Sequence, residues 1–200
     1  MRTNITILVA VLLLLLSSTA WTGDFVTGLD AYETGDYQAA TTEWQPLAAA
    51  GDADGQFGMG LLYANGFGVP LDDAQALKWY RLAADQGHAE AQCNIAVMYA
   101  NGWGVPQSDE EAFRWYSLAA EQGIGPAQVN LGQLYAGGFG VAEDHVQALK
   151  WFSVAAELGD DNAPEKRDYY ATRVTAEQRA EAEGLANAWM AGHQSLLASH

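Results

Sequence analysis

The chain has 200 residues, of which 25 are Asp or Glu and only nine are Lys or Arg, so its formal net charge is −16. Half of its residues are hydrophobic and seven are Trp, which is enough for a sizeable core and excludes a disordered chain. A single Cys excludes an intramolecular disulfide framework, and the strong negative charge argues against nucleic acid and anionic membrane surfaces as partners.

The first 20 residues have the features of a secretory signal peptide. Arg2 precedes a largely apolar segment from Ile5 to Leu16, and Ser18 and Ala20 place small residues at the −3 and −1 positions of a cleavage site. The apolar segment is short for a membrane span, which needs roughly 20 apolar residues. An uncleaved N-terminal anchor is the alternative. The sequence therefore predicts export, to the periplasm or out of the cell as a secreted protein.

The rest of the chain follows a repeat of 36 residues. The Gly-rich segment at 66–70 recurs at 102–106 and again at 138–142. Full units are predicted at 52–87, 88–123 and 124–159, after a truncated unit at 21–51 and before a partial unit and capping helix at 160–200. Self-similarity at this period is typical of a solenoid built from stacked repeats.

Each unit predicts two helices. In the central unit, residues 88–100 and 109–122 carry apolar side chains at helical spacing. The segment Gly102 to Pro106 separates them, because two glycines and a proline cannot continue a helix. One helical pair cannot bury its apolar face alone, so the pairs must stack. The expected fold is all-α, a right-handed α/α superhelix similar to that of tetratricopeptide repeats.

Polar residues mark the starts of several of these helices. Acidic residues precede or open the second helix of each unit, where they can accept hydrogen bonds from free N–H groups and complement the helix dipole. Residues Thr175 to Gln178 have the form of a capping box. We expect them to open a last helix that runs to about Met190 and covers the apolar face of the final unit.

The chain resembles the Sel-one-like repeat (SLR) family, a relative of the tetratricopeptide repeats. The matching residues in the central unit are Ala91-Gln92, Ile95-Ala96, Met98-Tyr99, Gly102 to Pro106, Asp109, Ala112, Trp115-Tyr116, Ala119-Ala120 and Gly123. The resemblance departs at Ala142, where the loop proline is missing. It implies a non-enzymatic adaptor or scaffold that is exported to the cell envelope and binds a protein or peptide along the solenoid.

Two other classes of function are alternatives. A cysteine-rich branch of the family has an attributed β-lactam-binding or β-lactamase activity, but this chain lacks the repeat cysteines, so that activity does not carry over. An envelope hydrolase is the enzymatic alternative. The non-enzymatic alternative is a structural component of an envelope assembly, which predicts that the aromatic side chains of the Gly-rich loops are permanently buried.

No motif for catalysis stands out. The chain has no Gly-x-Ser-x-Gly turn, no phosphate-binding loop and no dinucleotide fingerprint. His88 and Cys93 are five positions apart, which does not place them on one helix face. Helix capping explains the acidic clusters without a cation. The sequence therefore predicts no catalytic residue, no metal and no cofactor.

Two sets of residues are candidates for binding a partner. The loop aromatics Phe67, Trp103 and Phe139 either fold back over their loops or form a row that anchors a partner. The second set differs among units and is expected to line the concave face: Phe57, Leu61, Cys93, Asn94, Val97, Val129, Asn130 and Gln133. Its variation indicates either recognition or drift on a tolerant surface. The acidity of the chain suggests a basic or neutral partner segment.

Overall fold

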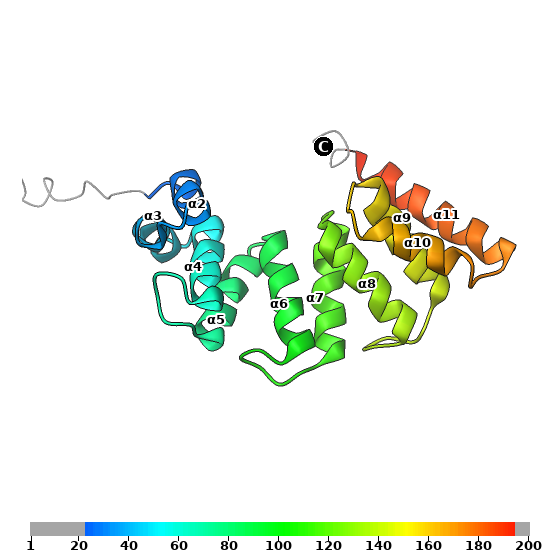
Figure 1. Ribbon diagram of the computed structural model, residues 1–200, viewed down its shortest axis with the longest axis horizontal. Coiled ribbons are helices and arrows are strands. Elements are labelled where there is room, and N and C mark those ends of the chain that lie inside the picture. Colours follow the sequence, from blue (N-terminus) through cyan, green and yellow to red (C-terminus); the bar gives the residue numbers. More distant parts are fainter. Residues whose placement is uncertain (1–22, 195–200) are drawn as a thin grey trace, which may run out of the picture.

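The structure is a computed structural model that describes residues 23–194, so the predicted signal peptide lies outside the described residues. Those residues form helices and contain no strand. The helices are α2 (Phe25–Glu33), α3 (Tyr37–Ala49), α4 (Ala53–Asn65), α5 (Asp73–Ala84), α6 (Ala89–Asn101), α7 (Asp109–Glu121), α8 (Gly125–Gly137), α9 (His145–Glu157), α10 (Ala163–Ala171) and α11 (Ala176–Gly192). They follow one another along a curved stack (Figure 1), which confirms the predicted all-α solenoid.

The helices pair as the repeat predicts. Each pair α4/α5, α6/α7 and α8/α9 packs within its own unit, and each second helix also packs against the first helix of the next unit. The first helices begin at Ala53, Ala89 and Gly125, which are 36 residues apart. At the C-terminus, α10 and α11 both pack against α9. The last helix thus covers the final unit, as predicted.

Side chains cap the second helices at their N-termini. Asp72 Oδ1 accepts from the Gln75 N–H at 3.0 Å, and Asp144 Oδ1 accepts from the Gln147 N–H at 3.0 Å. In the central unit the cap is Ser108, and the acids that follow it occupy the first turn, where they complement the helix dipole. The capping box at Thr175 is also confirmed, since both of its reciprocal hydrogen bonds are present.

The Gly-rich loops rest on the unit before them. In each loop the first glycine ends the helix in the left-handed conformation, and the second glycine also has a positive φ. A Cβ on Gly104 would lie 2.8 Å from the backbone carbonyl carbon of Asp73, and one on Gly140 would lie 2.2 Å from the carbonyl oxygen of Asp109. The loops therefore need glycine both for the turn and for close approach to the preceding second helix.

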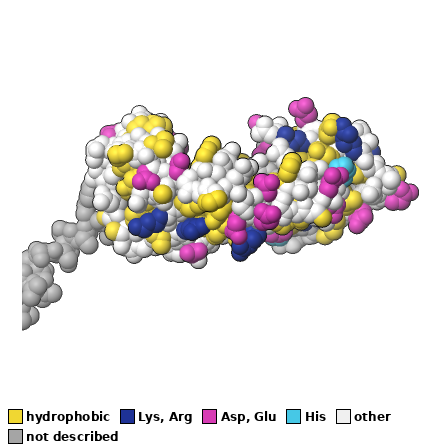
Figure 2. All heavy atoms as spheres, turned by 90° about the horizontal axis from the view of Figure 1, so that it is seen from below, with side chains coloured by type: hydrophobic (Ala, Val, Ile, Leu, Met, Phe, Trp, Pro, Cys, Tyr) yellow, Lys and Arg dark blue, Asp and Glu magenta, His cyan; other side chains and the backbone are white. Residues whose placement is uncertain are grey.

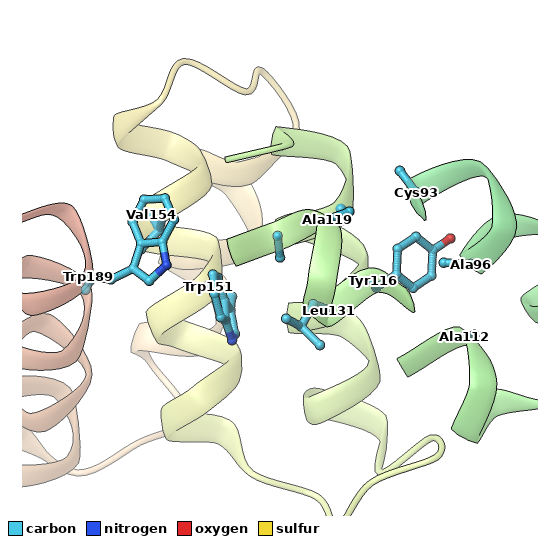
Figure 3. Close-up of a cluster of buried hydrophobic side chains, with 12 residues drawn as sticks. Cys93, Ala96, Ala112, Tyr116, Ala119, Leu131, Trp151, Val154 and Trp189 are labelled. Carbon is cyan, nitrogen blue, oxygen red and sulfur yellow. The ribbon is translucent and has the colours of Figure 1, made fainter. Parts of the chain in front are cut away.

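One aromatic residue per unit forms the centre of the core. At this position Trp44 and Phe152 have no exposed surface, Tyr80 is 2% exposed and Tyr116 is 4% exposed. Tyr116 points into a cluster of small and aliphatic side chains (Figure 3). Small residues face these rings. One of them is Gly132, where an added Cβ would lie only 2.7 Å from the Phe152 ring. The glycine allows the two helices of the unit to pack closely.

The residue before this core aromatic is less buried. Trp79 and Trp115 are half-buried, whereas Trp151 is buried beneath the C-terminal helix. The second aromatic of each pair is thus a core residue in every unit, whereas the Trp of the pair is buried only at Trp151.

Buried glutamines join the two helices of a unit, a feature that sequence reasoning missed, and Gln92 and Gln128 also donate to the backbone carbonyls of Ala84 and Ala120 in the preceding unit. Gln56 and Gln92 are buried, and their Oε1 atoms accept from Gln86 and Gln122 Nε2, both at 2.8 Å. The third buried glutamine of the series is Gln128, and the residue in its donor position is Leu158. Gln128 Oε1 has no hydrogen-bond partner within the described residues. The glutamine series thus ends at the junction with the C-terminal helices.

Candidate functional site

One hollow brings together residues from both predicted binding sets. It measures about 190 Å³ and lies between α4, α5, α6 and the loop after α6. We call it the Trp103 groove, and its lining residues are Leu61, Ala64, Asn65, Asp73, Tyr80, Asn94, Val97, Met98 and Trp103. The first helices and the loop aromatic, predicted as separate surfaces, meet here.

The three loop aromatics divide between the two predicted arrangements. Phe67 folds back and stacks on Tyr37, with ring centroids 4.2 Å apart and an interplanar angle of 13°. Trp103 and Phe139 are 51% and 53% exposed. The difference follows from the preceding unit, because the position of Tyr37 is occupied by Asp73 and Asp109 in the next two units. Without an aromatic partner on that helix, the later rings stay open to solvent.

The polar groups of the Trp103 groove are amides, a phenol and a carboxylate. Burial raises the pKa of Tyr80 far above its usual value, although a hydrogen bond with Asn94 acts in the opposite direction, so the phenol is neutral. Asn65 donates to the Leu61 carbonyl at 2.9 Å, which leaves its Oδ1 available. Asp73 adds a negative charge. These groups suit a segment that donates hydrogen bonds or carries positive charge.

A second hollow contains the remaining amide residues of the predicted set. It measures about 270 Å³ and lies between α8 and the start of α10. Its lining residues are Pro126, Val129, Asn130, Gln133, Asp160, Asn162 and Lys166. Gln133 is exposed, whereas Asn130 is half-buried. The hollow at the C-terminal end carries no exposed aromatic anchor, because Phe139 does not line it.

Three of the predicted variable positions serve packing instead. Cys93 and Val129 are buried, at 8% and 7% exposure, so the expectation that they face a partner is wrong. Phe57 is half-buried and stacks on His88, with ring centroids 4.5 Å apart. These positions differ among units because each fills a differently shaped part of the core. The accessible part of the set is therefore Leu61, Asn94, Val97, Asn130 and Gln133, with the open loop aromatics.

The structure gives His88 and Cys93 structural roles. His88 caps α6, where its Nδ1 accepts from the Ala91 N–H at 3.3 Å, and its Nε2 lies 3.3 Å from Asp54 Oδ1. Burial, with a smaller contribution from the negative charge of Glu90, raises the pKa of the Cys93 thiol to about 11. A thiol in that environment is protonated at neutral pH and is a poor nucleophile.

Between residues 23 and 194, no group of three or more His, Cys, Asp or Glu side chains is placed to hold a metal ion. Over the same range, none of the helices has the length and apolar character required to cross a membrane.

Known proteins share both the repeat and its fold. The Sel1 repeat family model matches three consecutive segments, residues 53–88, 89–124 and 125–160. A Sel1 repeat protein from Oxalobacter formigenes is 34% identical, with a TM-score of 0.69, over 74% of this chain and 60% of that one. A protective antigen of uropathogenic Escherichia coli strains that displays an SLR fold is 27% identical, with a TM-score of 0.58, over 88% of this chain and 48% of that one. This chain thus spans less than two thirds of either protein. None of the curated proteins matches it.

Proposed function

The chain belongs to the Sel1 repeat family, and from that premise we propose that it is a non-enzymatic scaffold that holds a basic or neutral peptide segment of another protein in the Trp103 groove. Sel1 repeat proteins are typically protein-interaction scaffolds. The observation that carries the proposal for this chain is Trp103, a large aromatic side chain that is 51% exposed at the edge of a hollow. Exposed Trp side chains of this kind are frequent anchors of protein interfaces.

The groove is suited to an extended segment. Leu61 and Val97 supply apolar contact, while Asn65 and Asn94 supply amide groups that can hydrogen-bond to a peptide backbone. The helices that carry them pack against their neighbours along the stack, so little ordering is needed when a segment binds. Figure 2 shows hydrophobic side chains exposed among acidic ones along the molecule. That surface favours a partner that is not itself acidic.

Replacing Trp103 with Ala tests this function. We expect peptides selected from a displayed library on the full chain to be basic or neutral, and to bind the W103A variant about thirtyfold more weakly, since a central Trp anchor contributes about 2 kcal/mol. Because Trp103 is exposed, the Tm should fall by less than about 2 °C.

The matched control is Phe139→Ala, which removes the equally exposed aromatic of the next loop. Selected peptides that bind wild type, W103A and F139A equally well would contradict the proposal. A large fall in Tm for W103A would instead show that the ring of Trp103 packs inside the chain.

We also propose that the chain is exported, on the evidence of the segment 1–20. If the signal peptide is cleaved after Ala20, protein recovered from the periplasm by osmotic shock should begin at Trp21. Mass spectrometry of the intact protein would measure this. Recovery of the chain with residues 1–20 still attached, in the cytoplasmic fraction, would contradict export.

A further inference from the structure

The first Gly-rich loop shows what covers a loop aromatic when the chain itself supplies the partner. The ring of Phe67 stacks on the ring of Tyr37, the residue that opens α3, with centroids 4.2 Å apart. The next loop residue, Gly68, holds the loop against the same place, because its added Cβ would lie 3.1 Å from the Cβ of Tyr37. In this unit the first residue of the preceding helix therefore covers the loop aromatic.

The second loop approaches its preceding helix in the same way but leaves its aromatic ring uncovered. A Cβ on Gly104 would lie 2.9 Å from the Cβ of Asp73, the residue that opens α5. The loop between α6 and α7 extends towards α5 (Figure 1). Asp73 thus stands beside Trp103 where Tyr37 stands beside Phe67, and both Asp73 and Trp103 line the Trp103 groove. An open indole ring here lies next to a negative charge.

The Asp73 carboxylate has no cationic partner within the described part of the chain. It is half-buried and takes part in no ion pair between residues 23 and 194. The N-cap of α5 is Asp72, so Asp73 is not needed to cap the helix. None of the residues that line the groove is Lys, Arg or His. Of the two cations of α5, Arg81 donates instead to the hydroxyl of Tyr99, which is not a lining residue.

A second acceptor of the groove is the amide oxygen of Asn65. The Nδ2 of Asn65 donates to the Leu61 carbonyl at 2.9 Å and to the Tyr32 hydroxyl at 3.3 Å, so its two N–H groups are used and Oδ1 is left to accept. The groove therefore offers an aromatic face, a carboxylate and an amide oxygen together. A guanidinium group matches all three, because it is planar, stacks on aromatic rings and has five N–H donors. The ammonium group of Lys is compact and strongly hydrated, and matches less well.

The next unit does not reproduce this arrangement. Its equivalent carboxylate is Asp109, but the ring of Phe139 lies over the end of its own helix, since a Cβ on Gly137 would lie 2.2 Å from that ring. The residue equivalent to Gly137 in the central unit is Asn101, whose side chain prevents Trp103 from lying back in the same way. Phe also attracts a cation less strongly than Trp does. The Trp103 groove is therefore the better cation site of the two.

From these contacts we propose that the Trp103 groove recognises one arginine side chain of the partner segment. This inference rests on the proposed function, because it names the residue that the same groove selects. The guanidinium stacks on the Trp103 ring, as Tyr37 stacks on Phe67 in the first unit, and donates to the Asp73 carboxylate and to Asn65 Oδ1. The partner thus supplies the group that covers the loop aromatic.

The probe for this inference is the tightest-binding peptide selected on the full chain, resynthesised with a fluorescent label and titrated by anisotropy. We expect one of its arginines to be essential. Citrulline at that position keeps the shape but not the charge, and should weaken binding to the wild-type chain about tenfold or more, while Lys should weaken it about fivefold. Asp73→Asn should weaken binding of the arginine peptide about tenfold. It should leave binding of the citrulline peptide nearly unchanged, because both changes remove the same interaction.

The matched control is Asp109→Asn, which makes the same change one unit further along and should not alter binding. Asp73→Asn leaves the Asp72 cap in place, so its Tm should fall by less than about 2 °C.

Three results would overturn the arginine site: selected peptides without arginine, a citrulline effect of equal size in the wild-type and Asp73→Asn chains, or equal weakening by Asp109→Asn and Asp73→Asn. If those peptides still bind W103A more weakly, the proposed function stands and only the arginine site fails. If none of the selected peptides depends on Trp103, the proposed function fails and the arginine site fails with it.

Discussion

Replacing Tyr116 with Ala is expected to lower the free energy of unfolding by about 3–5 kcal/mol, the usual cost of truncating a large buried aromatic. Tyr116 is 4% exposed in the central unit and contacts side chains from its own unit and from the next one. A cavity at this place weakens both the pair α6/α7 and its junction with α8. Because neighbouring units stabilise one another in a solenoid, the loss is felt along the array.

The adjacent tryptophan provides the control for this prediction. Trp115 is larger than Tyr116 but only half-buried, so Trp115→Ala should cost less, about 1–2 kcal/mol. Urea unfolding followed by circular dichroism measures both variants. Equal losses for the two variants, or a larger loss for Trp115→Ala, would show that the first aromatic of the pair is the core residue.

The repeat made the fold predictable because its signals are local. Three signals each act within a few residues: the glycine that ends the first helix, the Gly-x-Gly-Val segment that interrupts the helical pattern, and the capping residue before the second helix. Their recurrence at 36 residues then leaves stacked helical pairs as the arrangement that buries the apolar faces. The capping box at Thr175 is local in the same sense, and the helix after it begins where the sequence indicated.

The binding surface was less predictable because exposure depends on the neighbouring unit. Phe67 and Trp103 have the same local sequence, but only Phe67 meets an aromatic residue, Tyr37, on the preceding helix. A comparison of positions 37, 73 and 109 would have given this signal. The burial of Cys93 and Val129 carried no such signal, since a variable position on a first helix can face either the core or solvent.

The glutamine series illustrates information that was present but overlooked. Gln56, Gln92 and Gln128 recur at 36 residues, and so do their donors Gln86 and Gln122. A polar residue that recurs with the core period indicates a buried hydrogen bond, because an unpaired buried amide is costly. The missing donor at Leu158 likewise marks where the regular array gives way to the C-terminal helices.

The loop glycines should be the second most sensitive feature, and Gly140→Ala is the sharpest test. Gly140 has a φ of +68°, where an L side chain costs about 1–2 kcal/mol. Its added Cβ would also lie 2.2 Å from the Asp109 carbonyl oxygen and 2.6 Å from the Glu110 nitrogen, both backbone atoms that cannot rotate away. Displacing the loop from α7 adds about 1–3 kcal/mol of packing strain. The total expected loss is therefore about 2–5 kcal/mol.

Gly87→Ala separates the two contributions. Gly87 has a φ of +92°, but a Cβ there meets no atom within 4 Å. Its substitution should cost only the backbone contribution, about 1–2 kcal/mol. The difference between the two variants in urea unfolding is thus the free energy of close contact between a loop and the preceding unit. If both variants lost the same stability, the loops would not pack on their neighbours, and the exposed ring of Trp103 would be held by its own loop alone.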